Sequence, residues 1–489
     1  MKSKLKWFNH TRIAIILCVA TMFIYWMSYM GIHNIEYPLK DKVSSYDPYV
    51  QQFDAFKKGQ LHLDWEPDSK LVALDNPYEP SERKDMDYLW DRAYYNGRYY
   101  SYFGITPIVT LIYPFYFISG IIPAPLLMQF IYIGIFAVVF PKLMMMLLDR
   151  YGKKVSSVFK VLLTYTSYVS SLDLLYGRGR NPFYYIACTA AIAFITWFAY
   201  LFFKGIFEEE HRKRCIYFVF AGLMFALSFH ARVNTAFMAV FFIVPVVIGK
   251  LILAKKTWKV KLTEIGCLGL FVAVGFMLSF VYNYARFGNI LDFGTNYQLT
   301  VTDVSNYKLD ISEFDDAIKY YYEANLLKSV GENKVVFSDH DMESVDRYLY
   351  VSQYVGLYYI PFMMFGLMGI VMAFDKGKGK LYKITLLSTV LGGFIMAWIN
   401  FCLGGVIFRY LADFSTEVAV CAALGVLYVL EQSYYFENKR VAMLLKVFIV
   451  LVMVVSIYKA FQIMTVTNGN LFDIRENTFI GRLFNIKNN

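Results

Sequence analysis

Long apolar segments recur along almost the whole chain, and they constrain its fold more than any other feature. An α-helix needs about 20 predominantly apolar residues to cross the hydrocarbon core of a bilayer. Hydrophobic residues make up 57% of the 489 residues, and the mean hydropathy is +0.42. The sequence therefore predicts an all-α polytopic membrane protein with about eleven transmembrane helices. The predicted spans are 12–31, 124–147, 155–174, 182–203, 215–230, 233–252, 262–283, 351–373, 382–402, 408–430 and 441–463.

The basic residues are concentrated in the short loops between these segments. Five loops rich in Lys or Arg lie at 149–154, 210–214, 255–259, 376–380 and 438–440. Because cytoplasmic loops carry an excess of Lys and Arg, this pattern predicts a multi-pass protein of the cell membrane with a cytoplasmic N-terminus. The same rule explains the net charge of +10, so no nucleic-acid partner is expected.

Two long polar segments lie on the opposite, outer side in this topology. The first of them contains an apolar stretch, 104–122, that is interrupted by prolines and a glycine. This stretch is therefore predicted to be interfacial or re-entrant. The predicted division of the chain is 1–31 (first transmembrane helix), 32–123 (outer catalytic loop), 124–283 (helices two to seven), 284–350 (second outer loop), 351–463 (helices eight to eleven) and 464–489 (outer C-terminal tail).

The sequence lacks several common signatures of catalysis and of metal binding. Its six cysteines lie in or at the ends of apolar segments and form no Cys-x-x-Cys pair, so neither a disulfide framework nor a zinc site is expected. No Walker-type phosphate loop and no Ser-His-Asp spacing is present. The energy for any reaction must therefore arrive with the substrate.

Three acidic residues of the first polar segment are candidate catalytic groups. Asp47 and Asp54 are separated by two helical turns and so share a helix face, and Asp64 follows the helix-breaking Gly59. Ionisable groups held near a bilayer are costly and indicate function, which places Asp47, the nearest to the preceding span, first. The alternative is that these acids form the solvated surface of an outer loop.

Aromatic residues at the same height predict contacts with a substrate. Tyr and Trp at this depth commonly anchor a protein in the lipid headgroups, but their flat faces and hydroxyl groups also suit a sugar. Both interpretations stay open. The candidate substrate-binding residues are Tyr49, Glu66, Tyr95, Arg98, Tyr100, Tyr102 and Tyr410.

Three arginines near the outer ends of spans are candidate ligands of a lipid phosphate. They are Arg409, Arg286 and, third in rank, Arg232. The guanidinium group grips a phosphate with a planar fork of donors. The alternatives are snorkelling to phospholipid headgroups and, for Arg232, a satisfied polar kink between two apolar segments.

Several motifs of the first polar segment occur in a characteristic order. The first span is followed by Asp47, by Gly59 and by Asp-Trp-Glu-Pro at 64–67. This order resembles the first outer loop of protein O-mannosyltransferases and of the bacterial lipid A aminoarabinose transferase, which are glycosyltransferases of the GT-C fold. Bacterial multispanning transferases of this type are similar in further motifs, which lie at 54–56, 76–78, 95–100, 102–104 and 286–288.

The resemblance implies a GT-C-like bundle with a catalytic early Asp. The chain departs from mannosyltransferases in having Pro48 after Asp47 instead of Glu, and Glu66-Pro67-Asp68 where they have His-Pro-Pro. The oligosaccharyltransferase branch of the fold binds a divalent metal through acidic loop residues. Asp54, Asp64 and Glu66 are the acids that could bind a metal in the same way, but they define no ligand spacing. The prediction is therefore no cofactor, with a divalent metal as the alternative.

The resemblance also implies a function. The predicted enzyme transfers a sugar from a polyprenyl-phosphate donor to a hydroxyl of a glycan, teichoic acid or lipid acceptor at the outer face, with inversion and with Asp47 as general base. One alternative is a flippase or carrier for a lipid-linked sugar, which breaks no bond. Another is a non-catalytic subunit that recruits a cell-wall enzyme through the segment 298–350.

Overall fold

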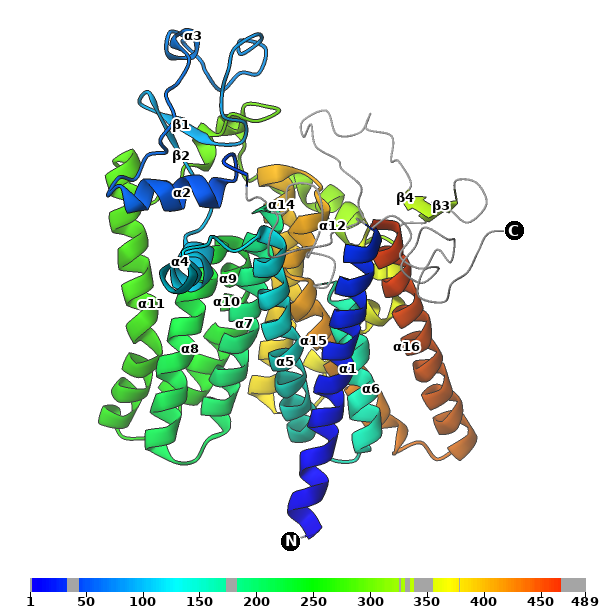
Figure 1. Cartoon of the computed structure of the whole chain (residues 1–489). Coiled ribbons are helices and arrows are strands. Elements are labelled where there is room, and N and C mark those ends of the chain that lie inside the picture. The colour runs from blue at the N-terminus through cyan, green and yellow to red at the C-terminus, as the bar shows by residue number, and fades with distance from the viewer. Residues whose placement is uncertain are drawn as a thin grey trace.

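The computed structural model describes residues 2–32, 44–172, 183–324, 327–329, 335–337, 355–377 and 379–467. Helices account for 73% of it and strands for 2%, which confirms the predicted all-α class. In Figure 1 the long helices lie side by side, α2 lies across one end of the bundle, and the N-terminal end of α1 lies at the other. We call these the loop end and the basic end. The predicted C-terminal tail beyond 467 lies outside the described residues.

Nine helical segments of the described chain are long and apolar enough to cross a membrane. They coincide with nine of the predicted spans, because an apolar segment in a bilayer must satisfy its own backbone hydrogen bonds. Their helices are α1 (Lys2–Ile32), α5 (Pro125–Tyr151), α7 (Phe183–Phe207), α8 (His211–Ala231), α9 (Val233–Met238) with α10 (Val240–Val247) and η3 (Ile248–Ile252), α11 (Trp258–Phe287), α14 (Lys380–Gly404), α15 (Ser415–Ser433) and α16 (Lys439–Thr467).

The two remaining predicted spans correspond to shorter helices. The prediction 155–174 corresponds to α6 (Ser157–Ser170), whose first turn is capped by the Ser156 hydroxyl. The prediction 351–373 corresponds to η9 (Pro361–Leu367) continued by α13 (Met368–Ala373). Pro361 begins this helix, because a proline ring fits the first turn of a helix but not its interior. The helix therefore cannot extend through the residues before Pro361, and it is shorter than the predicted span.

The loop end carries most of the remaining elements, and Figure 1 shows α2, α3, the β1–β2 hairpin and α12 there. These elements are α2 (Pro48–Lys57), α3 (Ser69–Val72), β1 (Ala93–Tyr95), β2 (Arg98–Tyr100), η1 (Ile108–Ile112), α4 (Tyr113–Ser119), η4 (Thr295–Tyr297), η5 (Val304–Asn306), η6 (Ile311–Glu313), α12 (Phe314–Tyr322), β3 (Leu327–Ser329), β4 (Val335–Phe337), η8 (Leu357–Tyr359) and η10 (Phe408–Asp413).

The β1–β2 hairpin is closed by Asn96 and Gly97. Both residues have positive φ, 49° and 71°, and Ala93 pairs with Tyr100 in antiparallel register. Two consecutive positive φ angles define the tight turn that matches the twist of a two-stranded hairpin, and Asn-Gly is its preferred sequence. The turn therefore folds the Tyr-rich motif at 95–100 back on itself.

The two long polar segments pack against each other at the loop end. Leu299 donates its backbone N–H to the Arg92 carbonyl at 3.0 Å, and Asp91 donates its own to the Leu299 carbonyl at 2.9 Å. The Arg83 guanidinium adds a hydrogen bond to the Thr300 carbonyl at 2.7 Å. These contacts fix the segment around Asp91 from a region about 200 residues further along the chain.

The apolar stretch at 104–122 forms η1 and α4, which together are shorter than a membrane span. In Figure 1, α4 is seen nearly along its axis, whereas the long helices run from one end of the bundle to the other. The stretch therefore lies across the bundle, as expected from its prolines. Its position at the membrane interface stays a prediction.

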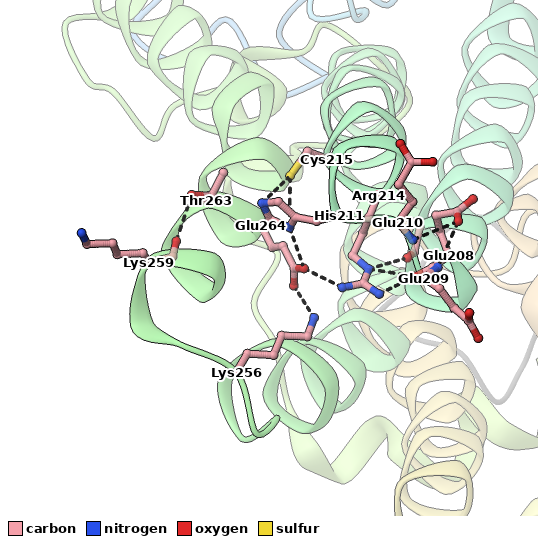
Figure 2. Close-up of polar contacts among 11 residues, drawn as sticks. Glu208, Glu209, Glu210, His211, Arg214, Cys215, Lys256, Lys259, Thr263 and Glu264 are labelled. Atoms are coloured by element: carbon pink, nitrogen blue, oxygen red, sulfur yellow. Dashed lines mark hydrogen bonds and ion pairs between the residues drawn. The ribbon is translucent and has the colours of Figure 1, made fainter.

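The basic end contains a group of ion pairs between α8 and α11, shown in Figure 2. The Glu264 side chain has no exposed surface, and it contacts Arg214 at 2.7 Å, Lys256 at 2.6 Å and His211 at 3.3 Å. Gly222 allows the same two helices to approach closely, since a Cβ at this position would lie only 2.4 Å from the Leu268 carbonyl oxygen. We call Glu264, Arg214, Lys256 and His211 the Glu264 cluster.

Candidate functional site

Asp47 caps the first turn of α2 from a buried position. Its Oδ1 accepts hydrogen bonds from the backbone N–H groups of Tyr49 at 2.8 Å and Val50 at 3.4 Å, and the residue is 5% exposed. Burial raises the pKa of this carboxyl to about 6, although the two N–H groups and the nearby Arg92 oppose the shift. Asp47 therefore exchanges a proton close to neutral pH, which is suited to general base catalysis.

Tyr49 is fully buried, and its hydroxyl group interacts electrostatically with the Asp47 carboxyl. This hydroxyl has no hydrogen-bond partner in the described structure. Burial, followed by the charge of Asp47, raises the pKa of the phenol well above its ordinary value, so the group stays a neutral donor. Buried polar groups of proteins are usually hydrogen-bonded, and an exception indicates strain, function or an absent ligand.

Arg92 joins α2 to the segment that precedes β1. Its Nε donates to the Gln51 side chain at 3.0 Å, and its Nη2 donates to the Tyr46 carbonyl at 2.5 Å. The residue is 3% exposed. Since Tyr46 precedes Asp47 and Gln51 lies in α2, Arg92 fixes the position of the Asp47 cap.

Asp91 forms a second buried acidic centre beside the first. Its carboxylate accepts a hydrogen bond from the Tyr102 hydroxyl at 3.0 Å and another from the Tyr184 hydroxyl. Its φ of 56° lies in the left-handed region, which an Asp adopts at a cost that the surrounding contacts must offset. The loop and the start of α7 are thereby joined through one carboxylate.

Arg409 lies over the face of Tyr184, with its guanidinium carbon 4.4 Å from the ring centre. Tyr410 is a second aromatic neighbour at 5.5 Å. Within the described residues, no carboxylate pairs with this guanidinium. A cation stacked on aromatic rings without an acidic partner is well placed to receive an anion.

Arg232 has a different environment, because its fork is occupied by Asp413. The Nε–Oδ1 and Nη2–Oδ2 distances are 2.5 and 2.8 Å, and Asp413 has no exposed surface. Thr235 and Asn400 donate further hydrogen bonds to the same carboxylate at 2.7 and 3.1 Å. The guanidinium of Arg232 also lies 5.2 Å from the Tyr410 ring, so this ion pair supports the region around Arg409.

These residues form one polar assembly at the loop end, which we call the tyrosine–arginine cluster. It draws on the start of α2, the segment before η1, the start of α7, the α8–α9 junction and η10. Its members are Asp47, Tyr49, Asp91, Arg92, Tyr102, Tyr184, Arg232, Arg409, Tyr410 and Asp413. Of the predicted site residues, it brings together Asp47, Tyr49, Tyr102, Arg232, Arg409 and Tyr410.

The other two predicted acids lie outside this cluster. Asp54 is seven residues from Asp47, about 10 Å along the helix axis at 1.5 Å per residue, and it pairs with Lys57 at 2.7 Å. Asp64 pairs with Lys58, which lowers the pKa of its carboxyl. The helix face that Asp47 and Asp54 were expected to share is not found, since Asp47 turns inward as a helix cap, whereas Asp54 and Asp64 form ion pairs with partly exposed lysines.

The remaining predicted residues occupy the outer loop and its contact with α11. Arg286 donates to the Ser101 carbonyl at 2.8 Å and to the Asn283 side chain at 2.9 Å, so protein groups hold two of its nitrogens. Its role in phosphate binding stays a prediction. Glu66 and Arg98 are exposed, whereas Tyr95 and Tyr100 pack against Phe287 with ring centres 5.6 and 5.3 Å away.

Four members of the cluster were not among the predicted site residues, namely Asp91, the adjacent Arg92, Tyr184 and Asp413. Asp91, Tyr184 and Asp413 are contributed by separate elements, and no local spacing relates them. One signal was present for two of them, because each acid lies within four residues of an arginine at the edge of an apolar segment, as Asp91 beside Arg92 and Asp413 after Arg409. Ionisable residues in such positions rarely stay buried without a partner.

No group of three His, Cys, Asp or Glu side chains in the described chain is arranged to hold a metal ion. The carboxylates of the cluster, Asp47, Asp91 and Asp413, are held by backbone N–H groups, tyrosine hydroxyls and Arg232 respectively. The residues present thus show no arrangement that fits a divalent ion. Metal independence of the chain's activity stays a prediction.

No protein-family model matches the chain, and no curated protein matches it. Among solved structures, it is similar to the oligosaccharyltransferase of Archaeoglobus fulgidus in the apo form, with 11% identity and a TM-score of 0.49. It is also similar to the archaeal oligosaccharyltransferase AglB from Archaeoglobus fulgidus in complex with an inhibitory peptide and a dolichol-phosphate, with 12% identity and a TM-score of 0.43. Each match covers 96% of this chain and 59% of the other. A likeness of this size assigns neither a fold family nor an activity.

Proposed function

We propose that this chain is a membrane glycosyltransferase of the GT-C type that transfers a sugar from a polyprenyl-phosphate donor to an acceptor hydroxyl. One observation carries the proposal. A buried carboxyl whose pKa is raised to about 6, Asp47, shares a polar cluster with Arg409, a cation that has no acidic partner among the described residues. Glycosyl transfer from a lipid phosphate requires these two functions, a base and an anion site.

In the proposed reaction, Asp47 removes the proton of the acceptor hydroxyl. The acceptor oxygen attacks the anomeric carbon, and the bond from that carbon to the phosphate oxygen breaks with its electron pair moving to the phosphate. Attack opposite the leaving group inverts the configuration. A carboxylate with a pKa of about 6 is mostly deprotonated at pH 7, yet it is more basic than an ordinary Asp, which favours proton transfer.

Arg409 stabilises the charge that develops on the departing phosphate. Preorganised cations in a site from which water is largely excluded contribute strongly to such a step. Arg232 and Arg286 already hold protein oxygens, so we assign them to positioning, Arg232 beneath Tyr410 and Arg286 behind the loop at Ser101. Asp91 acts through Tyr102 and Tyr184, which it fixes below the Arg409 guanidinium.

We further propose that the loop end faces the outside of the cell membrane and receives its acceptor there. The basic loops at the opposite end support this orientation. The acceptor classes that suit an outer membrane surface are a glycan, a teichoic acid or a lipid. The flat faces of Tyr102 and Tyr410, which are partly exposed, offer stacking surfaces for the transferred sugar.

The test uses the full chain in proteoliposomes with a panel of polyprenyl-phosphate hexoses labelled in the sugar. Asp47→Asn preserves a helix-capping side chain but removes the base, so transfer should fall roughly 100- to 10,000-fold. Asp75→Asn is the matched control, because Asp75 is an exposed acid of the same loop. Unchanged transfer by Asp47→Asn contradicts the assignment, and label that crosses the bilayer while still attached to its lipid identifies a carrier instead.

A further inference from the structure

A cavity of about 410 Å³ lies between the long helices, towards the basic end. Its walls come from α5, α7, α10, α14 and α15, and the tyrosine–arginine cluster contributes none of its lining residues. Most of the lining is apolar, as illustrated by Leu143, Leu147, Phe203, Phe242, Val246 and Leu386. On α7 the lining runs from Ile195 to Phe207, about 18 Å at 1.5 Å per residue. The cavity is therefore long, apolar and separate from the site of the proposed reaction.

Three cations from three elements meet at the mouth of this cavity. Arg150 ends α5, Lys250 belongs to η3 and Lys380 begins α14, and all three are exposed lining residues. In the part of the chain that the structure describes, none of them forms an ion pair. Two acids are nearby: Asp149 is bound to Lys160 at 2.7 Å, and Glu417 lines the cavity from the first turn of α15, away from the three cations. The rule that cytoplasmic loops are basic explains the sign of these charges but not their convergence on one opening.

Two residues that line the cavity carry hydroxyl groups without a partner among the described residues. Thr385 Oγ1 and Thr196 Oγ1 are buried and make no hydrogen bond in the described structure, and both residues line the cavity. Thr385 lies five residues after Lys380, about 8 Å deeper along α14. In a glycerophospholipid the ester groups lie on the acyl-chain side of the phosphate, so they enter the cavity below a phosphate bound at its mouth. A hydroxyl that is unpaired in the protein can donate to such an ester oxygen.

We propose that this cavity binds an anionic glycerophospholipid from the leaflet at the basic end. The phosphate lies among Arg150, Lys250 and Lys380, an ester oxygen accepts a hydrogen bond from Thr385, and one acyl chain extends along α7. The charge of the mouth requires an anion, and the apolar walls require a hydrocarbon chain, which a soluble phosphate does not supply. The inference is independent of the proposed function, because no residue of the tyrosine–arginine cluster lines the cavity.

The experiment compares lipid binding by the purified full chain in nanodiscs made of phosphatidylglycerol, phosphatidylcholine or their mixture. Lipids that stay bound after transfer to detergent are counted by native mass spectrometry. Wild-type protein should retain phosphatidylglycerol in preference to phosphatidylcholine. The triple variant R150Q/K250Q/K380Q should lose roughly tenfold or more of this affinity, since each cation near a membrane surface contributes to the binding of an anionic lipid.

A matched triple variant, K259Q/K439Q/R440Q, removes the same number of exposed charges at the basic end but none at the cavity. It should retain phosphatidylglycerol as the wild type does. Thr385→Val should weaken binding by a smaller factor than the triple variant. Equal retention of both lipids by the wild type, or equal loss in both triple variants, overturns the proposal. Displacement of the lipid by inorganic phosphate alone would also contradict it, because it would show that the acyl chain contributes nothing.

Discussion

The two ends of the bundle differ in how their buried charged groups are paired. In the Glu264 cluster, one acid without exposed surface is surrounded by Arg214, Lys256 and His211. In the tyrosine–arginine cluster, the acid Asp91 is held by neutral tyrosine hydroxyls, and the cation Arg409 has an aromatic ring in place of a carboxylate. The first arrangement is complete within the protein, whereas the second leaves a positive charge that an incoming anion can neutralise.

This difference is the one expected between a charge cluster that serves stability and a cluster that serves the proposed function. A buried charge costs several kcal/mol unless it is paired, so a fold that needs only stability pairs it. The Arg232–Asp413 pair shows that the loop end can also do so, since it satisfies that arginine with both carboxylate oxygens. Arg409, which lies in the same helical element as Asp413 and stacks on Tyr184, is therefore an exception within its own surroundings.

Replacement of Arg409 is expected to have the largest effect on activity. Arg409→Ala should lower the transfer rate roughly 100- to 1,000-fold, the range for loss of one preorganised group that stabilises developing charge. Because no acid is left unpaired, the free energy of unfolding should change by only about 1 kcal/mol, the value of one cation–π contact. Initial rates and chemical unfolding of the same preparations measure both quantities.

Arg409→Lys is the matched control for charge without the planar fork. It should recover part of the rate, since Lys supplies a point charge but no bidentate contact. If Arg409→Ala instead unfolds the protein while Arg409→Lys is fully active, the guanidinium is a structural group and the contrast between the two clusters fails.

Glu264 should behave in the opposite way, with a large effect on stability. Glu264→Ala leaves Arg214 and Lys256 side by side without their acid, and removal of one partner from a buried ion pair costs about 3 to 5 kcal/mol. Protein that still folds should transfer sugar at the wild-type rate, because the cluster lies at the basic end. Thermal unfolding in detergent measures the first effect. A stable but inactive Glu264→Ala protein would contradict the structural role.

The sequence was sufficient to predict the spans and part of the candidate site. The reasons differ for the two. Membrane spans are determined by local apolar length, so nine of them were found as long helices. Asp47 and Arg409 were predicted because ionisable residues at span ends are rare enough to be noticed. Tyr184, on which Arg409 stacks, lies 93 residues after its hydrogen-bond partner Asp91. Only the packing of the helices brings that pair together.

The prediction that Asp47 and Asp54 share a helix face was wrong for a local reason. A spacing of seven residues places Asp47 and Asp54 on one face only if both lie inside the helix. Asp47 instead precedes the helix and turns its side chain back to cap it. Pro48, which follows it, is the residue that indicates such a helix start.

The pH dependence of the free energy of unfolding tests whether burial raises the pKa of Asp47. Its pKa in the folded protein is about 6, above the ordinary value of 3.8, so the folded state holds its proton more tightly than the unfolded state. The contribution of Asp47 therefore falls as the pH rises from about 4 to about 6, by about 3 kcal/mol in total. Asp47→Asn should lose this dependence and be more stable than the wild type at pH 7, because Asn also caps helices.

Chemical unfolding of both proteins at several pH values between 4 and 7 measures this difference, and other titrating groups cancel in the comparison. The transfer rate of the wild type should fall below pH 6, since a protonated Asp47 is no base. If the variant and the wild type keep a constant difference across this range, the Asp47 carboxyl is not shifted and the argument for its basicity is lost.

The smallest effect is expected at Asp54, and it tests whether exposure distinguishes the acids of this loop. Asp54 forms an ion pair with Lys57 at 2.7 Å in which both side chains are more than one third exposed, and such pairs contribute less than about 1 kcal/mol. Asp54→Asn should therefore leave both the transfer rate and the unfolding midpoint near those of the wild type. If it stops transfer while Asp47→Asn does not, the base lies on the exposed face of α2, and burial is not what defines the catalytic acid.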